Sequence, residues 1–376
     1  MRLFRCQACG ETVYFENTRC GTCSSHVGYL PEVGLMSALE PEVSPELVEA
    51  LQQVGLQDAA KALHSEAEVW LARVWPGRRY RFCSNAQLQV CNWMVPAESK
   101  DSFCLACRHN RCISDPTQRE NLARWRKLEG AKHRLFYSMV KLQLPLLTRD
   151  KQRDGLAFDF LDDPPDPDAP RVVTGHSNGL ITIALREADD VERERMRKVL
   201  GERYRTLLGH LRHETGHYFW DRLVRDGDKV EACRAVFGDE GVDYSQALRT
   251  YYADGPPAGW QSCCITAYAT AHPWEDFAES WAHYLHMVDT LETAAAHGME
   301  IHPRNGARRF RAVTEFDPYR PPAFDLMIEN WLPLSQAANS LNRSMGQPDL
   351  YPFVLSPLAV EKLCFIHGLV QEHRSS

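Results

Sequence analysis

Apolar positions along the chain follow two different patterns. Over residues 118–143, and again over about 202–225, they recur every three to four positions, which predicts amphipathic helices. The runs LAFDFL at 156–161 and LITIAL at 180–185 are short, apolar and bounded by turn residues, which predicts strands. Two strands ahead of a long helix fit a small twisted sheet lying over that helix. We therefore expect an α+β fold that is mainly helical.

The segment before these patterns is organised differently. Residues 31–68 begin with three prolines, Pro31, Pro41 and Pro45, and continue as the helix-like stretch PELVEALQQVGLQDAAKALHSEAEV. We expect a linker and one or two short helices there. The sequence thus predicts three parts, of which the last is the main domain: 1–30, 31–117 and 118–376.

Composition and charge exclude several classes of protein. The 376 residues, with 44% hydrophobic content, are enough for one sizeable core with smaller modules attached. A net charge of -7 and a sequence pI near 6.1 argue against attraction of the whole protein to nucleic acid or to anionic membranes. No apolar run resembles a signal sequence or approaches the roughly 18 residues that a membrane span needs. We expect a soluble protein of the cytoplasm.

Thirteen cysteines would suggest disulfides in a secreted protein, but in a reducing compartment clustered cysteines are candidate metal ligands. Nine of them precede residue 113. The first four form two C-x-x-C pairs separated by ten residues, which is the spacing of a zinc ribbon. Four thiolates at this spacing can hold one structural zinc ion: Cys6, Cys9, Cys20 and Cys23.

A second cysteine group follows the first. Four of its members can form another four-thiolate zinc site: Cys83, Cys91, Cys104 and Cys107. The C-x-x-C pair at its end is a good half-site, whereas the gap between the first two cysteines is less diagnostic. Cys112 is a spare or competing ligand.

Arginines and aromatic residues alternate in the segment WLARVWPGRRYRF at 70–82. Such a mixture can bind nucleic acid. Four arginines around a small metal module more often form a solvated face or contacts within the same protein. We expect the second role.

A five-residue motif inside the helix expected at 202–225 carries the candidate chemistry. It reads HETGH, with His213 and His217 four positions apart, so both imidazoles lie on one helical face and can converge on one ion. Glu214 then lies beside the open coordination position. This arrangement suits metal-assisted hydrolysis, in which a carboxylate takes a proton from the attacking water and passes it to the leaving amine.

A third ligand is expected in the segment YATAHPWEDFAE at 268–279. A helix starting near Pro273 puts Glu275 and Glu279 on one face. Glu275 can then bind the zinc while Glu279 accepts a hydrogen bond from the outer nitrogen of a ligand histidine, although the two acids could exchange roles. Tyr268, in the loop entering the helix, could donate to the oxyanion of the tetrahedral intermediate. Three histidines nearby are competing ligands or packing residues: His272, His283 and His286.

These motifs carry resemblances to known families. HETGH and YATAHPWEDFAE resemble the gluzincin metallopeptidases, including the lethal-factor-like group, in which a tyrosine seven residues before the ligand glutamate and an acid four residues after it recur. Over nearly all 376 residues, the N-terminal cysteines, CNWMVPA, GHSNGLITIAL, HETGHYFW and HPWEDFAESWAHYLH resemble the bacterial zinc-binding metallopeptidase family with an N-terminal zinc ribbon. Cys112 is a departure expected in few relatives, which leaves the ligands of the second cysteine site open.

The resemblance implies a zincin-like metallopeptidase domain with assigned roles. It implies a catalytic zinc held by His213, His217 and Glu275. It also implies Glu214 as general base, Tyr268 as oxyanion donor and Glu279 as the acid behind a ligand histidine. In gluzincins an edge strand near the active helix pairs with an extended substrate. The strand at 180–185 could be that edge strand or an internal strand.

Two functions from different classes follow. The first is a zinc-dependent peptidase with one catalytic and two structural zinc ions, a protein or peptide substrate, the cysteine modules as a surface for a protein partner, and no membrane or nucleic-acid partner. The second is a non-catalytic zinc-ribbon adaptor that binds protein or nucleic acid and uses the helical zinc only to hold its fold. Glu214 and Tyr268 favour the enzyme, because a structural site needs neither a base nor an oxyanion donor.

Overall fold

The computed structural model divides into two compact units, which we describe separately: the N-terminal unit, Leu3–Asn110, and the C-terminal unit, Arg111–Ser376 together with Met1–Arg2. The residues that it describes are 1–43, 50, 53–54, 67–166, 168–199, 201–304 and 311–375. Within these ranges we find no helix with both the length and the apolar character needed to cross a membrane.

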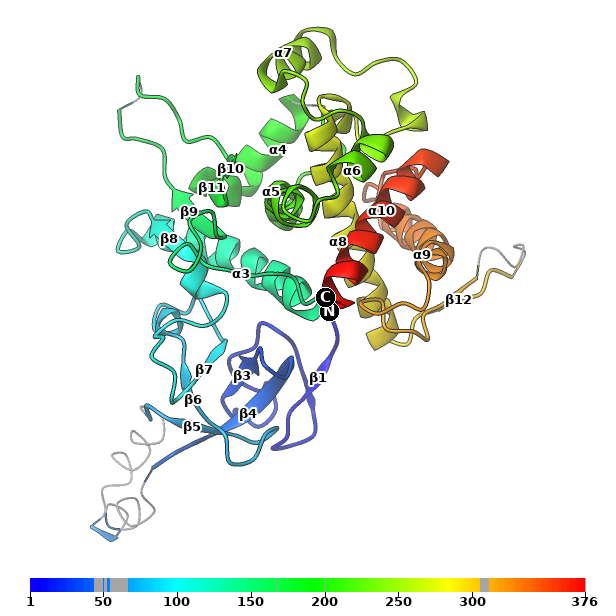
Figure 1. Cartoon of the computed structure of the whole chain (residues 1–376). Helices are drawn as coiled ribbons and strands as arrows, with labels where there is room; N and C mark the ends of the chain where they lie inside the picture. Colours follow the sequence, from blue (N-terminus) through cyan, green and yellow to red (C-terminus); the bar gives the residue numbers. More distant parts are fainter. Residues whose placement is uncertain are drawn as a thin grey trace. The chain divides into compact units, whose positions relative to one another are not determined.

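The N-terminal unit is built on antiparallel strands (Figure 1). A short ribbon of β1 and β2 comes first, followed by a five-stranded sheet in the order β3-β4-β5-β6-β7. The strands are β1 (Phe4–Arg5), β2 (Thr12–Val13), β3 (Val27–Leu30), β4 (Leu35–Pro41), β5 (Trp70–Ala72), β6 (Arg79–Phe82) and β7 (Met94–Pro96). All five sheet strands contribute buried side chains to one core: Leu30, Leu39, Trp70, Ala72, Tyr80 and Met94.

The segment after Pro31 differs from the prediction. Where the sequence predicts a linker, β4 pairs with β3 on one side and β5 on the other. The prolines do not prevent this, because Pro31 precedes the strand and Pro41 is its last residue, where a missing amide donor is tolerated. The short helices predicted within 45–69 lie almost entirely outside the described residues.

The arginines of the segment 70–82 make contacts inside the N-terminal unit. Arg73 forms an ion pair with Glu40, and Arg79 forms a two-pronged pair with Glu42. Both acids lie on or next to β4, so the first pair links β4 to the end of β5 and the second reaches across β5 to β6 in the same sheet. These are contacts of the intramolecular kind that we expect from the sequence.

A four-stranded sheet in the order β10-β11-β9-β8 belongs to the C-terminal unit. Its strands are β8 (Asn110–Ile113), β9 (Ala157–Leu161), β10 (Gly175–Ser177) and β11 (Leu180–Ala184). β9 and β11 run parallel, whereas β10 and β11 form a hairpin through Asn178 and Gly179, both with positive φ as the tightest hairpin turns require. The two strands predicted at 156–161 and 180–185 are confirmed. The edge-strand alternative for 180–185 is wrong, because β11 has neighbours on both sides and β10 is the edge.

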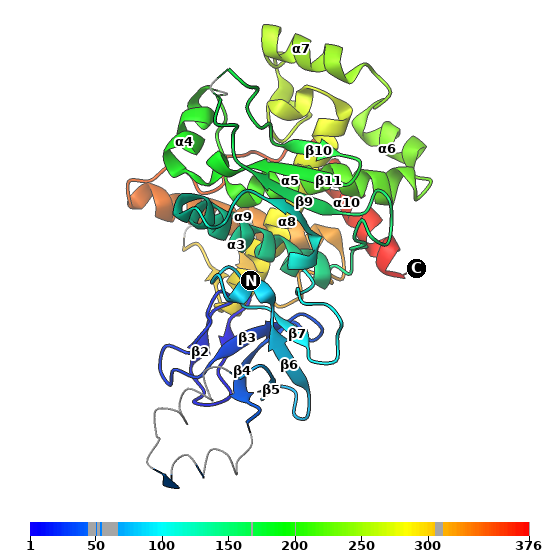
Figure 2. The same ribbon diagram turned by 90° about the vertical axis from the view of Figure 1, so that its left-hand side faces the viewer.

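Helices account for most of the C-terminal unit (Figure 2). They are α3 (Arg119–Lys141), α4 (Asp190–Val199), α5 (Leu207–Phe219), α6 (Val230–Phe237), α7 (Tyr244–Asp254), α8 (Pro273–Ala296), α9 (Phe324–Ser344) and α10 (Pro357–Ser375), with a short ribbon of β12 (Glu300–Ile301) and β13 (Ala312–Val313). α5 and α8 lie side by side, with α3 packed on α5 and with α9 and α10 packed on α8. The chain is therefore a mixed α+β protein.

The helix predicted at 202–225 starts later than expected. α5 begins at Leu207 because the Thr206 side chain caps it by accepting a hydrogen bond from the amide of Gly209. After Phe219 the helix continues to Arg225 as a π-helical turn, so its predicted end is confirmed. The helix predicted at 118–143 is α3, and the helix predicted to start near Pro273 is α8.

Two features hold α5 close against α8. A Cβ at Gly216 would lie only 2.7 Å from the Cα of Ala278, so the backbones approach closely at a position where any side chain would collide. One turn before Gly216 in α5, Arg212 forms a buried ion pair with Asp289 of α8. Asp289 also accepts hydrogen bonds from two hydroxyl groups, those of Ser138 and Tyr319, so its charge is not left unpaired.

Candidate metal centre

Three side chains from α5 and α8 converge at the contact between these helices. Nε2 of His213 lies 3.0 Å from Oε2 of Glu275, and Nε2 of His217 lies 3.5 Å from the same oxygen. Glu275 is buried, and the ligand-type atoms of all three residues lie within 4.8 Å of one another. The close approach at Gly216 makes this convergence possible, since the glycine lies between the two histidines on α5.

The donor set fits a zinc ion. Two imidazole nitrogens and one carboxylate oxygen are a common catalytic zinc set, and bonds of about 2.0–2.1 Å in a tetrahedron place neighbouring ligand atoms about 3.3 Å apart. The two nitrogen–oxygen distances lie on either side of that value. Oε2 of Glu275 is also buried and makes no hydrogen bond to the described residues, a costly state for a carboxylate oxygen unless a cation binds it.

Glu279 lies one helical turn beyond Glu275 and contacts the far side of His213. Its Oε1 is 2.6 Å from Nδ1 of His213. Burial alone would raise the pKa of Glu279, but the hydrogen bond to His213 and the charges of His213 and His283 together outweigh burial, so that pKa is lowered. The ionised carboxylate keeps the proton of His213 on Nδ1, so Nε2 is free to bind a metal.

Glu214 and Tyr268 flank the three convergent side chains. Glu214 is half-buried, and none of the described residues hydrogen bonds to its carboxylate. Burial raises the pKa of Glu214, and the nearby His213 and His217 offset part of that rise. Tyr268 lies in a short 3-10 turn ahead of α8, with its ring 5.9 Å from that of His213. Burial, and then the charge of Glu275, raises the pKa of the Tyr268 phenol, so it remains a hydrogen-bond donor.

The histidines named as competing ligands are engaged elsewhere. His272 caps α8, because its Nδ1 accepts from the amide of Trp274 and its Nε2 donates to a backbone carbonyl. Nδ1 of His283 is 2.7 Å from the hydroxyl of Tyr351. His286 contacts Arg212 through Nδ1. In the described residues none of the three joins a cluster able to hold a metal.

Tyr244 contacts the centre from α7 and could not be identified from the sequence. Its hydroxyl donates to Oε1 of Glu275 at 2.6 Å. The two residues are 31 positions apart, and no spacing rule connects them. A helix start could have been read from Asp243, whose side chain caps α7, but a capping signal does not indicate which group the first helical residue contacts.

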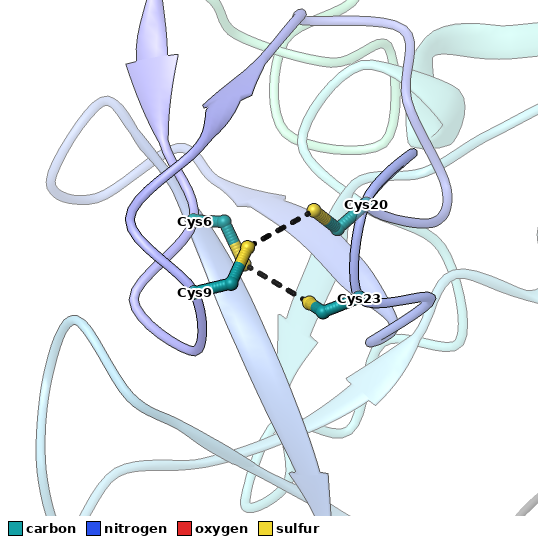
Figure 3. Close-up of side chains that lie close together, drawn as sticks. All are labelled: Cys6, Cys9, Cys20 and Cys23. Atoms are coloured by element: carbon teal, nitrogen blue, oxygen red, sulfur yellow. Dashed lines mark hydrogen bonds between the residues drawn. The ribbon is translucent and has the colours of Figure 1, made fainter.

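The first cysteine group is assembled in the N-terminal unit (Figure 3). The sulfur of Cys6 lies 3.7 Å from that of Cys23, and the sulfur of Cys9 lies 3.6 Å from that of Cys20. A disulfide would bring sulfurs to about 2.05 Å, whereas zinc–sulfur bonds of about 2.3 Å in a tetrahedron separate them by about 3.8 Å. The spacing is therefore that of a four-thiolate zinc site.

The second cysteine group is assembled in the same unit and is fully buried. Its members are those predicted: Cys83, Cys91, Cys104 and Cys107. The sulfurs of Cys91 and Cys104 are 3.7 Å apart, again the separation expected around zinc. Cys112 is exposed and is not a member of this cluster.

Two family models together match most of the chain. Residues 121–369 match the model of a family described as putative zinc-binding metallo-peptidase, and residues 3–118 match the model of a zinc-ribbon domain. Uncharacterized proteins of Mycobacterium bovis and of two strains of Mycobacterium tuberculosis are each 40% identical to the chain, over 99% of it and 96% of their own length. No solved structure matches the chain. Zinc is thus supported both by the matched families and by the cysteine clusters.

Proposed function

From the premise that the chain belongs to the putative zinc-binding metallo-peptidase family, we propose that its C-terminal unit is a zinc-dependent peptidase whose catalytic metal is held by His213, His217 and Glu275. One observation carries this proposal. The Nε2 atoms of two histidines converge on the buried Oε2 of Glu275 at separations that suit ligands of one zinc ion, and an acid with no hydrogen-bond partner among the described residues, Glu214, stands next to them. A purely structural site does not need that acid.

Each residue of the proposed site has its own role in peptide hydrolysis. His213, His217 and Glu275 would hold a zinc ion, which would supply Lewis-acid chemistry toward the scissile carbonyl and a bound water molecule. Glu214 takes a proton from the attacking water and delivers it to the leaving amine, a role suited to a carboxyl whose pKa is raised by burial. Tyr268 donates a hydrogen bond to the carbonyl oxygen as negative charge develops there. Glu279 holds the His213 ring in the tautomer and orientation that metal binding needs.

The edge strand β10 supports a peptide substrate in extended form. β10 contacts α5, and its outer edge is not paired with another described strand. An extended peptide can add to such an edge through backbone hydrogen bonds. The predicted substrate-binding edge is thereby assigned to 175–177 and not to 180–185. A mixed sheet beside a helix that carries HETGH is also the arrangement of a zincin-like, gluzincin-type domain, which we propose for this unit.

The cysteine clusters complete the proposed metal content. Two four-thiolate sites hold two structural zinc ions, so the protein binds three in all. Each ion would crosslink segments of the N-terminal unit, whose own apolar core is small. We propose that this unit serves as a structural element and as the surface for a protein partner, and that the enzyme acts on protein or peptide substrates in the cytoplasm.

Zinc content and cleavage, measured on matched variants, test the proposal. Zinc is determined by elemental analysis on wild type and His213→Ala, and cleavage of a peptide library is measured on wild type and Glu214→Gln. We expect His213→Ala to lose one zinc of three, since it removes a ligand of a single site. We expect Glu214→Gln to keep all its zinc and to lose cleavage, because the amide cannot accept the proton.

The outcome that contradicts the proposal is equally specific. If His213→Ala retains the wild-type zinc content, His213 is not a ligand. If all zinc is bound and any cleavage is independent of Glu214, the site is structural and the non-catalytic adaptor becomes the better description.

A further inference from the structure

None of the residues of α7 is buried, a property that in this unit it shares with α4. Helices in proteins are stabilised mainly by packing an apolar face against the rest of the fold. α7 lacks such a face, so only a few side chains attach it. Those side chains point at the proposed metal centre.

Two tyrosines on one face of α7 make these attachments. Tyr244 and Tyr251 are seven positions apart, which places them two turns apart on the same side of the helix. The Tyr244 ring packs against the ring of His272 at 5.1 Å, and the Tyr251 ring packs against Tyr268 at 5.7 Å. This face of α7 therefore contacts two parts of the proposed site. One is the start of α8, which carries Glu275, and the other is Tyr268, the proposed oxyanion donor.

The Tyr244 hydroxyl makes the one polar contact of this face with a proposed ligand. It donates to Oε1 of Glu275 at 2.6 Å, whereas Oε2 of the same carboxylate lies beside the histidine nitrogens and makes no hydrogen bond to the described residues. The two oxygens of Glu275 are therefore in different environments. One is held by a phenol and the other is left for a metal.

We propose that Tyr244 is a positioning residue of the metal centre: it fixes Glu275 so that a single oxygen, Oε2, binds the ion, and it ties α7 to the centre. This inference rests on the proposed function, since it takes Glu275 to be a ligand. A carboxylate without this partner can rotate and bind through both oxygens or swing away. Outer partners of metal ligands commonly change metal affinity by about 10- to 100-fold.

A single-atom change tests this role. Tyr244→Phe removes the hydroxyl and keeps the ring that packs on His272, so the fold of α7 is preserved. Tyr251→Phe is the matched control, because it makes the same change on the same face of the same helix, and no hydrogen bond from its hydroxyl to the described residues is lost. Zinc affinity is measured by competition with a chelator, with His213→Ala defining the contribution of the other zinc sites.

We expect Tyr244→Phe to weaken zinc binding at the His213 centre by about tenfold or more and Tyr251→Phe to leave it unchanged. A second readout follows the coordination itself. With Co²⁺ as the probe, the difference spectrum between each protein and its His213→Ala form isolates this centre. We expect Tyr244→Phe to give weaker visible absorption, because a second carboxylate oxygen raises the coordination number, and a change in packing alone would not do this.

The results separate this inference from the proposed function. If His213→Ala keeps the wild-type zinc content, the centre itself is refuted, and the role of Tyr244 with it. If His213→Ala loses one zinc while Tyr244→Phe keeps wild-type affinity and the wild-type cobalt spectrum, only the role of Tyr244 is refuted. Equal weakening in Tyr244→Phe and Tyr251→Phe also refutes it, since the effect would then come from α7 and not from the bond to Glu275.

Discussion

Replacing Gly216 by alanine tests whether the close approach of α5 and α8 builds the metal centre. In an ordinary helix, Gly→Ala stabilises the folded state by about 0.5–1 kcal/mol, because glycine loses more backbone entropy on folding. At Gly216 the added Cβ would lie 2.7 Å from the Cα of Ala278. The obstacle is backbone and cannot rotate away. The sign of the effect should therefore be reversed.

The size of the effect follows from the distance. Ordinary contact of a Cβ begins at 3.4 Å, so the two helices must separate locally by about 0.7 Å. Overpacking of this kind costs about 1–3 kcal/mol, which exceeds the gain in helix propensity. We expect the free energy of unfolding to fall by about 1–2 kcal/mol. His213 and His217 move with α5 while Glu275 stays on α8, and metal–ligand distances tolerate only about 0.2 Å. Zinc affinity should fall as well.

Gly130→Ala in α3 is the matched control. It makes the same substitution inside a helix, but a Cβ there meets nothing within 4 Å. We expect it to stabilise the protein by about 0.4–1 kcal/mol and to leave zinc binding unchanged. Urea unfolding gives the free energies, and chelator competition gives the affinity. If Gly216→Ala is as stable as Gly130→Ala and binds zinc like wild type, the close contact does not set the geometry of the centre.

Three further predictions concern other parts of the molecule. Cys104→Ser should lose one zinc and make the N-terminal unit sensitive to protease, whereas Cys112→Ser should do neither, as elemental analysis and limited proteolysis would report. Lys362→Met leaves the buried Asp276 carboxylate without its cation and should cost about 3–5 kcal/mol in urea unfolding, with the added change Asp276→Asn restoring part of the loss. Burial lowers the pKa of His367 to about 4, so below pH 6.5 the unfolded chain takes up a proton that the folded chain does not. The free energy of unfolding should therefore fall as the pH is lowered from 6.5 toward 4. The fall should be less steep in His367→Leu, which lacks this group.

Local signals in the sequence predict the elements that carry the proposed site. Pro273 marks the start of α8 because proline suits a first helical turn, and the four-residue spacing of His213 and His217 forces them onto one face. Both signals lie within a few residues of the feature that they predict. That is why the sequence alone predicts that the segment 268–279 supplies a ligand beside the HETGH helix.

Features that depend on distant partners could not be predicted. β4 follows Pro31 by four residues and ends at Pro41, and only its pairing with β3 and β5 makes it a strand. The environment of β11 depends on β9 and β10, so its own alternation of residues could not tell an edge from an interior position. Tyr244 owes its role to a hydrogen bond with a residue 31 positions away.

The division of the proposed ligands between α5 and α8 has a consequence for when the proposed centre can form during synthesis. A nascent chain that has emerged only as far as α5 carries HETGH but no Glu275, and it cannot form the centre. α8 in turn packs against α10, and Lys362 of α10 pairs with Asp276 in the first turn of α8, so the surroundings of the proposed third ligand are complete only once α10 is present. The proposed hydrolytic site would then be complete only after α10 has folded onto α8. A ribosome-bound chain that stops short of α10 would be unable to cut its neighbours.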